Sequence, residues 1–199
     1  MDIDWVPDPS CDLWNPDDGR FFPDLEITPL MQGVGACVPT TLAMLTGAHP
    51  SAFMVPEMNT QDPRTWSDLL APYGMGLAYV PCDVRRLEHY LDELVALDDA
   101  FLLSYCLHPL DCEPDERGKL GPSHVVLLYR DMIYDARLGT SCQAEEHSCR
   151  LRHTKRIFRV VPRGSRRGSV RTARAVLGDH PSWGIRQPPA PAAAPPASG

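Results

Sequence analysis

Residues 124–139, HVVLLYRDMIYDARLG, constrain the fold of this chain more than any other stretch. Two runs rich in Val, Leu, Ile and Tyr flank the polar pair Arg130–Asp131. Runs of β-branched and aromatic residues separated by a short polar turn are typical of a β-hairpin. We therefore predict that the two runs pair antiparallel and turn near Arg130–Asp131, so that the chain contains an antiparallel sheet.

Helical patterns precede this hairpin. The apolar positions of residues 37–47 recur at helical spacing, and Gly47 is typical of a helix C-cap. Proline is tolerated only in the first turn of a helix, because its nitrogen carries no hydrogen to donate. Pro39 therefore predicts that this helix begins very near Cys37.

Two further helices and three further strands are expected outside these segments. A short helix over 65–74 would be capped near Thr65 and stopped by Gly74. The run 83–97 is the clearest amphipathic helix, with Asp83 as its N-cap. The expected strands are 76–82, 100–107 and 156–161.

Helices first and strands later, with the strands in hairpins, predict an α+β fold in which N-terminal helices pack on an antiparallel sheet. The folded domain is expected to span 31–161. Residues 1–30, rich in Pro and Asp, are expected to form an irregular arm held by the rings of Trp5, Trp14, Phe21 and Phe22. Residues 162–199 are Gly, Ser and Arg followed by Pro and Ala, too polar and proline-rich to order themselves, and are expected to be a flexible tail.

The net charge of −7 is unevenly distributed. Residues 1–149 have a balance of −17, whereas residues 150–174 hold ten Lys or Arg and no acid. This basic segment has three interpretations: it folds back on the acidic body, it is a solvated tail, or it binds nucleic acid or an anionic membrane. Since no stacking aromatics are interleaved with the basic residues, we favour the first two.

The N-terminal sequence MDIDWVPDPSCDLW is acidic and broken by proline, which is unlike a secretory signal peptide. No apolar run approaches the ~18 residues that a membrane-spanning helix needs. We expect a protein without a transmembrane segment that acts in a cytoplasm, its own or that of a host.

One of the seven cysteines stands apart. Without a secretory signal, reduced thiols are expected, and a lone cysteine is by default a buried structural residue. Cys37, however, follows the sequence QGVGA and opens a helix, whose N-terminal N–H groups and dipole favour a thiolate. The same N–H groups can hold the oxyanion that forms when a thiolate attacks an acyl carbon, and Gln32 can aim its amide at that oxyanion.

A thiolate nucleophile needs a general base, and His124 is the leading candidate. It begins the first strand of the hairpin, and Asp135 lies on the returning strand. Because paired strands lie about 5 Å apart, an imidazole and a carboxylate can meet across the hairpin, where the carboxylate would orient the ring. Asp131, a turn residue of the same hairpin, is the alternative for that role.

These segments resemble the Cys and His boxes of papain-like cysteine peptidases. MQGVGACVPTTLAMLTG and SHVVLLYRDMIYDARLG are nearest to the compact bacteriocin-leader-peptidase domains of bacterial exporters. The resemblance covers 31–161 and implies that Gln32 is the oxyanion-hole glutamine, Cys37 the nucleophile, His124 the base and Asp135 the orienting residue. The sequence departs from the family at Val38, which stands where a glycine commonly follows the nucleophile, and at Pro39, which stiffens the next position.

The resemblance implies a thiol protease or related amide hydrolase that acts on a protein or peptide substrate through a thioacyl intermediate, with no cofactor and no metal. Two alternatives stay open. One is a glutamine deamidase or acyl transferase that modifies a partner protein. The other is a non-catalytic binding protein on the same fold.

Three other candidates have both a functional and a purely structural interpretation. Trp66 is expected in the core, with a role in a substrate cleft as the alternative. A zinc site is a weak alternative for one set of ligands, whose spacing matches no established pattern, and weaker for a second set. The first set is Cys142, His147, Cys149 and His153, and the second is Cys106, His108 and Cys112.

Overall fold

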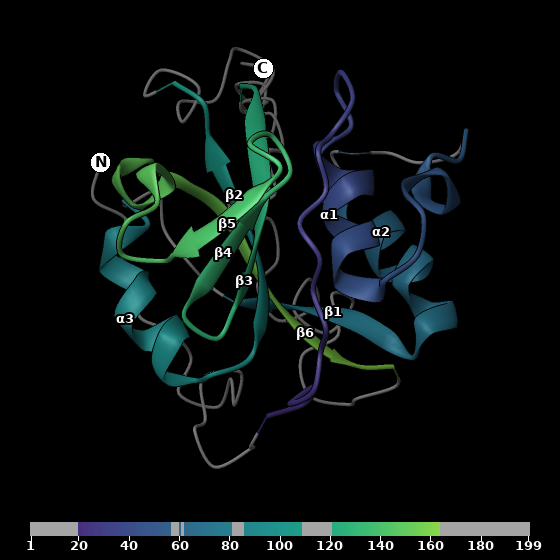
Figure 1. Cartoon of the computed structure of the whole chain (residues 1–199), viewed down its shortest axis with the longest axis horizontal. Coiled ribbons are helices and arrows are strands. Elements are labelled where there is room, and N and C mark those ends of the chain that lie inside the picture. The colour runs from purple at the N-terminus through teal and green to yellow at the C-terminus, as the bar shows by residue number, and fades with distance from the viewer. Residues whose placement is uncertain (1–19, 57–59, 61, 81–85, 109–120, 164–199) are drawn as a thin grey trace, which may run out of the picture.

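The computed structural model describes residues 20–56, 60, 62–80, 86–108 and 121–163 (Figure 1). Within them the predicted α+β fold is confirmed: three α-helices accompany one six-stranded antiparallel sheet. The helices are α1 (Cys37–Thr46), α2 (Pro63–Leu70) and α3 (Glu88–Ala96). The strands are β1 (Met75–Val80), β2 (Ala100–Cys106), β3 (Ser123–Tyr129), β4 (Met132–Asp135), β5 (Thr140–Gln143) and β6 (Thr154–Pro162). Short 3-10 helices are η3 (Pro50–Phe53), η4 (Ala71–Tyr73) and η6 (Ser148–Leu151).

The sheet has the order β1-β6-β2-β3-β4-β5. The predicted hairpin is formed by β3 and β4, with Leu128 opposite Ile133 and Tyr129 opposite Met132. Arg130 turns the chain there with a positive φ of 58°. Strand β6, the last that the structure describes, lies between β1 and β2, so within the described residues β1 joins the sheet through β6.

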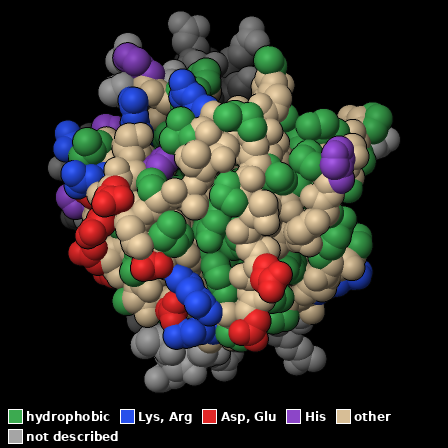
Figure 2. Space-filling model, in the orientation of Figure 1, with side chains coloured by type: hydrophobic (Ala, Val, Ile, Leu, Met, Phe, Trp, Pro, Cys, Tyr) green, Lys and Arg blue, Asp and Glu red, His purple; other side chains and the backbone are tan. Residues whose placement is uncertain are grey.

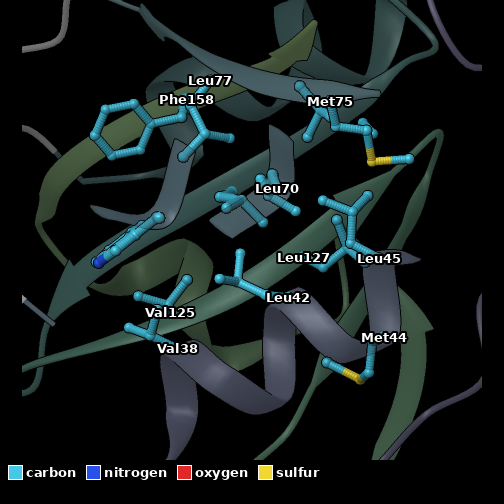
Figure 3. Packing of buried hydrophobic residues seen from close by; sticks show 14 of the residues in the cluster. Val38, Leu42, Met44, Leu45, Leu70, Met75, Leu77, Val125, Leu127 and Phe158 are labelled. Atoms are coloured by element: carbon cyan, nitrogen blue, oxygen red, sulfur yellow. The ribbon is translucent and has the colours of Figure 1, made fainter. Parts of the chain in front are cut away.

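Alternating side chains of the central strands supply two separate cores, because successive residues of a strand point to opposite faces. Leu102, Val125 and Leu127 face α1 and α2, and part of this first core is shown in Figure 3. Their neighbours Leu103 and Val126 belong to the second core, with Leu87, Leu91 and Leu94 of the α3 segment. Figure 1 accordingly shows α1 and α2 on one side of the sheet and α3 on the other.

Helix α1 begins at Cys37, as predicted. Pro39 is its third residue, where no N–H is needed, and the first helical hydrogen bond runs from Thr40 N to Ala36 O at 3.0 Å. Gly47 ends the helix with φ 70°, in the left-handed conformation that glycine tolerates best. Val38, which follows Cys37, is 3% exposed and belongs to the core (Figure 3).

The predicted starts of α2 and α3 were wrong, whereas Gly74 ends the helical segment as predicted, in the left-handed conformation with φ 74°. Helix α2 begins at Pro63 rather than at 65, because Asp62 caps it by accepting the Arg64 N–H, and it gives way to η4 at Ala71. Helix α3 begins at Glu88 rather than at 83, because the backbone just before it pairs elsewhere: the Leu87 N–H donates to Arg152 O. Asp83, its expected N-cap, lies outside the described residues.

Over the described residues, the bounds of the other three predicted strands agree with those of β1, β2 and β6 to within two residues. Residues 81–82, the end of the predicted strand 76–82, lie outside the described residues. Strand β5 and helix η6 were not predicted. The tail 164–199 and the rings of Trp5 and Trp14 also lie outside the described residues.

The segment 20–36 runs between α1 and the sheet (purple in Figure 1). It is bonded to both sides: Leu30 N donates to Met44 Sδ of α1, and Leu25 N donates to the Tyr129 hydroxyl of β3. The side chains of Phe22, Leu25, Ile27 and Leu30 pack on the first core. The expected N-terminal arm is therefore, over its described part, a strap that holds the helical layer to the sheet.

Part of the basic segment 150–174 is folded into β6. Lys155, Arg156 and Arg159 are each at most 3% exposed. Arg159 forms a buried ion pair with Asp99, with Nη2 at 2.8 Å from Oδ2. Over residues 150–163 the structure thus favours the interpretation that this segment folds onto the acidic body, whose Asp and Glu side chains gather over α3 at the left of Figure 2. None of the helices that the structure describes is long and apolar enough to cross a membrane.

Candidate active site

His124 and Asp135 meet across the hairpin. His124 Nε2 lies 2.7 Å from Asp135 Oδ1, and both side chains are about 95% buried. Continuing the β3–β4 register places Asp135 opposite Val126, two residues from His124 on the same face of the sheet. Diagonal neighbours of this kind are within reach of long side chains, which is how a strand pair brings an imidazole to a carboxylate.

A tight turn after β4 fixes the Asp135 carboxylate. The Arg137 backbone N–H donates to Asp135 Oδ1 at 2.8 Å, and the Gly139 N–H donates to the Asp135 carbonyl at 2.8 Å. Gly139 has φ 64°, and a Cβ there would come within 3.0 Å of the Met31 side chain, so this position requires glycine. The turn therefore locks the carboxylate and leaves room for the segment that carries Gln32.

Cys37 stands at the N-terminus of α1 and is half-buried. Burial raises the pKa of its thiol, but the hydrogen bond and the charge of His124 outweigh burial, with help from the backbone N–H groups of Val125 and Val38. The net pKa of Cys37 is therefore below its ordinary value. Since His124 Nε2 is engaged by Asp135, the ring nitrogen that remains for Cys37 is Nδ1.

His124 is shifted in the opposite direction. Burial lowers the pKa of the imidazole, but hydrogen bonds to Asp135 and Cys37 raise it to about 9. Burial likewise raises the pKa of the Asp135 carboxyl, yet its hydrogen-bond donors hold that pKa well below its usual range. These opposed shifts favour a thiolate at Cys37 facing an imidazolium at His124 near neutral pH.

Two other cysteines in the described part of the chain lack this environment. Burial raises the pKa of the Cys149 thiol to about 12, with a further contribution from the Asp135 charge. The pKa of Cys142 is raised as well, by burial and by Glu146. Compared with these two thiols, Cys37 is the one whose surroundings promote ionisation.

The structure brings Gln32 to the same place. Its backbone N–H donates to the carbonyl of Ala136, the residue after Asp135, at 2.7 Å. Its side-chain oxygen Oε1 is buried and has no hydrogen-bond partner among the described residues. Gly33 and Gly35 form the turn between Gln32 and the helix, with the Ala36 N–H donating to Gly33 O at 3.2 Å. All four predicted site residues therefore lie at the junction of α1 with the ends of β3 and β4.

Comparisons with family models, with curated proteins and with solved structures found no match. The evidence for function is therefore the geometry of the site and the sequence resemblance that led to it.

The other predicted candidates are Trp66 and two sets of zinc ligands, one of which includes His147 beside Asp135. Trp66 is 1% exposed and packs edge-on against Phe158 at 5.9 Å, which confirms the core interpretation. Over the described ranges no group of three or more His, Cys, Asp or Glu side chains is arranged to hold a metal ion. The weak zinc interpretation of Cys142, His147, Cys149 and His153 therefore gains no support, and Cys112 of the second set lies outside the described residues.

Two residues at the site were missed by sequence reasoning. Tyr105, opposite His124 on β2, packs its ring edge-on against the imidazole at 5.6 Å and shields it. His147 places Nε2 at 3.2 Å from Asp135 Oδ2. Nothing in the sequence around Tyr105 indicates more than a buried strand. His147 was considered only as a zinc ligand, because β5, the strand that leads to it, was not predicted.

Proposed function

We propose that this protein is a papain-like cysteine hydrolase that cleaves a peptide, isopeptide or side-chain amide. The observation that carries the proposal is the arrangement of a half-buried Cys37 at the start of α1, the buried His124 imidazole, and Asp135 with Oδ1 at 2.7 Å from His124 Nε2. In this arrangement the pKa of the thiol is lowered while that of the imidazole is raised to about 9. A structural cysteine beside a structural histidine has no need of opposed shifts of this kind, whereas a thiolate nucleophile does.

In the first half-reaction, the Cys37 thiolate attacks the carbonyl carbon of the amide. The new C–S bond forms as the carbonyl electron pair moves to oxygen. The Cys37 backbone N–H and the Gln32 side-chain amide would donate to that oxyanion, each such donor being worth roughly 10²–10³ in rate. The C–N bond then breaks, the His124 Nδ1 proton passes to the leaving amine, and a thioester of Cys37 remains.

In the second half-reaction, water attacks the thioester carbon. Neutral His124 accepts a water proton at Nδ1, and the C–S bond breaks to release a carboxylic acid and the Cys37 thiolate. Throughout, Asp135 holds the ring through Nε2 and stabilises its protonated form. If the leaving group is ammonia from a glutamine side chain, the same steps accomplish deamidation.

The test is the pH dependence of alkylation by iodoacetamide, followed residue by residue by mass spectrometry. Cys142 is the internal control. Below its pKa, the thiolate fraction of an ordinary thiol falls tenfold per pH unit, so from pH 8 to pH 6 the Cys142 rate should fall roughly 100-fold. Cys37 should lose less than about tenfold over the same range. Parallel pH profiles for Cys37 and Cys142 would contradict the proposal.

The class of reaction is read from the products. After incubation with a peptide mixture, a cleaved chain indicates a peptidase, and the replacement of a side-chain amide by a carboxylate indicates a deamidase. Both products must disappear in the Cys37→Ala variant. A non-catalytic binding protein would give a different result. The Cys37→Ala variant would bind its partner with full affinity, and the wild-type protein would leave that partner chemically unchanged.

A further inference from the structure

His147 lies beside the candidate site on a segment that the proposed chemistry does not use. It follows β5 in a turn in which the His147 N–H donates to Gln143 O at 3.2 Å, and it caps the 3-10 helix η6. Its side chain is 4% exposed. A buried imidazole must account for both ring nitrogens, so the partner of each decides what the residue does.

The two ring nitrogens of His147 have different partners. The Cys149 backbone N–H donates to Nδ1 at 3.1 Å, so Nδ1 is an acceptor and carries no proton. In a neutral imidazole the proton then resides on Nε2, which lies 3.2 Å from Asp135 Oδ2. The backbone therefore selects the tautomer of His147 that can donate to Asp135.

The Asp135 carboxylate has donors on both oxygens. Oδ1 accepts from His124 Nε2 and from the Arg137 N–H, and Oδ2 accepts from His147 Nε2. The first oxygen faces the proposed base, and the second is bound by a histidine whose other nitrogen is bonded to the backbone. Tyr105 and Cys149 also approach this carboxylate, and their pKa values are raised by burial first and by its charge second.

We propose that His147 is a positioning residue, which acts through Asp135 to orient His124 and thereby to keep Cys37 ionised. The inference rests on the proposed function. The four side chains Cys37, His124, Asp135 and His147 then form one hydrogen-bonded chain, in which only Cys37 and His124 exchange a proton. His147 does not touch the substrate; it fixes the rotation of the carboxylate and adds a donor that stabilises its ionised form.

A purely structural role for His147 would be to cap η6, and the chain contains a matched example of that role. His49 caps the 3-10 helix η3 by accepting the Ser51 N–H at Nδ1, and it is exposed. Capping a 3-10 helix therefore does not require burial, and among the described residues no carboxylate is bonded to the second nitrogen of His49. The bond from His147 Nε2 to Asp135 is the feature that capping does not explain.

Two substitutions separate the roles of the two nitrogens. In His147→Asn, the amide oxygen can replace Nδ1 as the cap, while the side chain is too short to reach Asp135. In His147→Gln, the amide nitrogen can replace Nε2 as the donor to Asp135, while the cap is lost. His49→Asn is the control for removing a capping imidazole elsewhere.

The readout is the pH profile of Cys37 alkylation. His147→Asn should lower the rate at pH 6 by roughly three- to tenfold while leaving the rate at pH 9 unchanged, because the loss of one charge-assisted hydrogen bond weakens the imidazolium that stabilises the thiolate. His147→Gln and His49→Asn should keep the wild-type profile. An unchanged profile in His147→Asn, or an equal loss in the Asn and Gln variants, would overturn the inference.

A measurement on the wild-type protein keeps the inference testable if either His147 variant fails to fold. Nitrogen-15 NMR of the imidazole rings at pH 8 should show His147 protonated on Nε2 and bare on Nδ1, and the reverse tautomer would overturn the inference. The proposed function has a test of its own, which does not depend on His147. If wild-type Cys37 shows the alkylation pH profile of an ordinary thiol, the proposed pair of Cys37 and His124 is not catalytic, whatever the tautomer of His147.

Discussion

Asp99 and Asp135 are buried carboxylates at opposite ends of strand β3. The backbone carbonyl of Asp99 accepts the N–H of Arg130, which follows the last residue of β3, whereas Asp135 bonds His124 near its beginning. Both are at most 3% exposed, and both accept a backbone N–H at 2.8–2.9 Å. They differ in the cation that faces them: a guanidinium for Asp99 and imidazoles for Asp135.

The difference separates a carboxylate that stabilises the fold from a carboxylate that, in the proposed function, orients the imidazole of the general base. A guanidinium is a permanent cation in proteins, so the buried pair of Arg159 with Asp99 is suited to holding the fold. It also holds the N-terminal strap, since Phe21 N donates to Asp99 and the Phe21 ring lies 4.5 Å from the guanidinium carbon. The His124 imidazole can release its proton, with a pKa of about 9, so the Asp135 cluster has at least two states.

The largest effect on stability is expected from removing the charge of Asp99. Asp99→Asn leaves the Arg159 guanidinium buried without a counter-charge, which should lower the free energy of unfolding by about 3–5 kcal/mol. Urea unfolding measures this loss. Asp98→Asn is the control, because the pair of Asp98 with Arg20 is solvent-exposed and such pairs contribute about 0–1 kcal/mol. Equal losses at the two positions would contradict the distinction between them.

The same change at Asp135 should affect reactivity first. Asp135→Asn removes the charge that stabilises the His124 imidazolium, so the thiol returns toward its ordinary pKa. The alkylation rate of Cys37 at pH 6 should then fall roughly 10²–10³-fold, the range that separates a depressed thiol pKa from an unperturbed one. Asp131→Asn, in the turn of the same hairpin, should leave the rate unchanged. A loss in the Asp131 variant and none at Asp135 would reassign the orienting role.

A smaller effect is the pH dependence of stability that His124 introduces. Its pKa is raised from 6.5 to about 9, so its contribution is complete below pH 6.5 and is lost as the pH rises through about 9. In the wild type, the lowered pKa of Cys37 opposes this loss, because the folded state has already released the thiol proton. The Cys37→Ala variant should therefore lose stability more steeply than wild type between pH 6.5 and 9 in urea titrations. Identical slopes would show that the two groups are not coupled.

The smallest effect concerns the strap. The Tyr129 hydroxyl donates to the Pro23 carbonyl at 2.7 Å and accepts the Leu25 N–H at 3.2 Å. Tyr129→Phe should cost about 1 kcal/mol in the free energy of unfolding. Hydrogen exchange should locate the loss in residues 20–30 and leave α3 protected as in wild type. A uniform loss of protection would mean that the strap is not a separate unit.

The sequence predicted the parts of this architecture whose signals are local. The runs of Val, Leu, Ile and Tyr on either side of Arg130–Asp131 predicted the β3–β4 hairpin, and the pairing of His124 with Asp135 followed from its strand spacing. The start of α1 at Cys37 followed from Pro39, whose missing N–H is harmless only in the first turn. These are effects of single residues on their near neighbours.

The parts that were not predicted depend on contacts distant in the chain. The start of α3 is set by the bond from Leu87 to Arg152, and the partner of Arg159 is 60 residues earlier at Asp99. His147 reaches Asp135 only because β5 returns the chain beside β4. The cap Asp62 before Pro63 is the exception, since a side-chain acceptor followed by proline is a local start signal that was overlooked.

The position of β6 has a consequence for the synthesis of this protein. Strand β1 is hydrogen-bonded to β6 and joins the sheet through it, and Phe158 and Val160 of β6 complete the core on which α1 packs. A nascent chain on the ribosome can form α1 and the β3–β4 hairpin early, but the helical layer has no finished sheet to rest on until residue 162 has emerged. The packing of α1 on a complete first core must then wait for β6, because Phe158 and Val160 belong to that core.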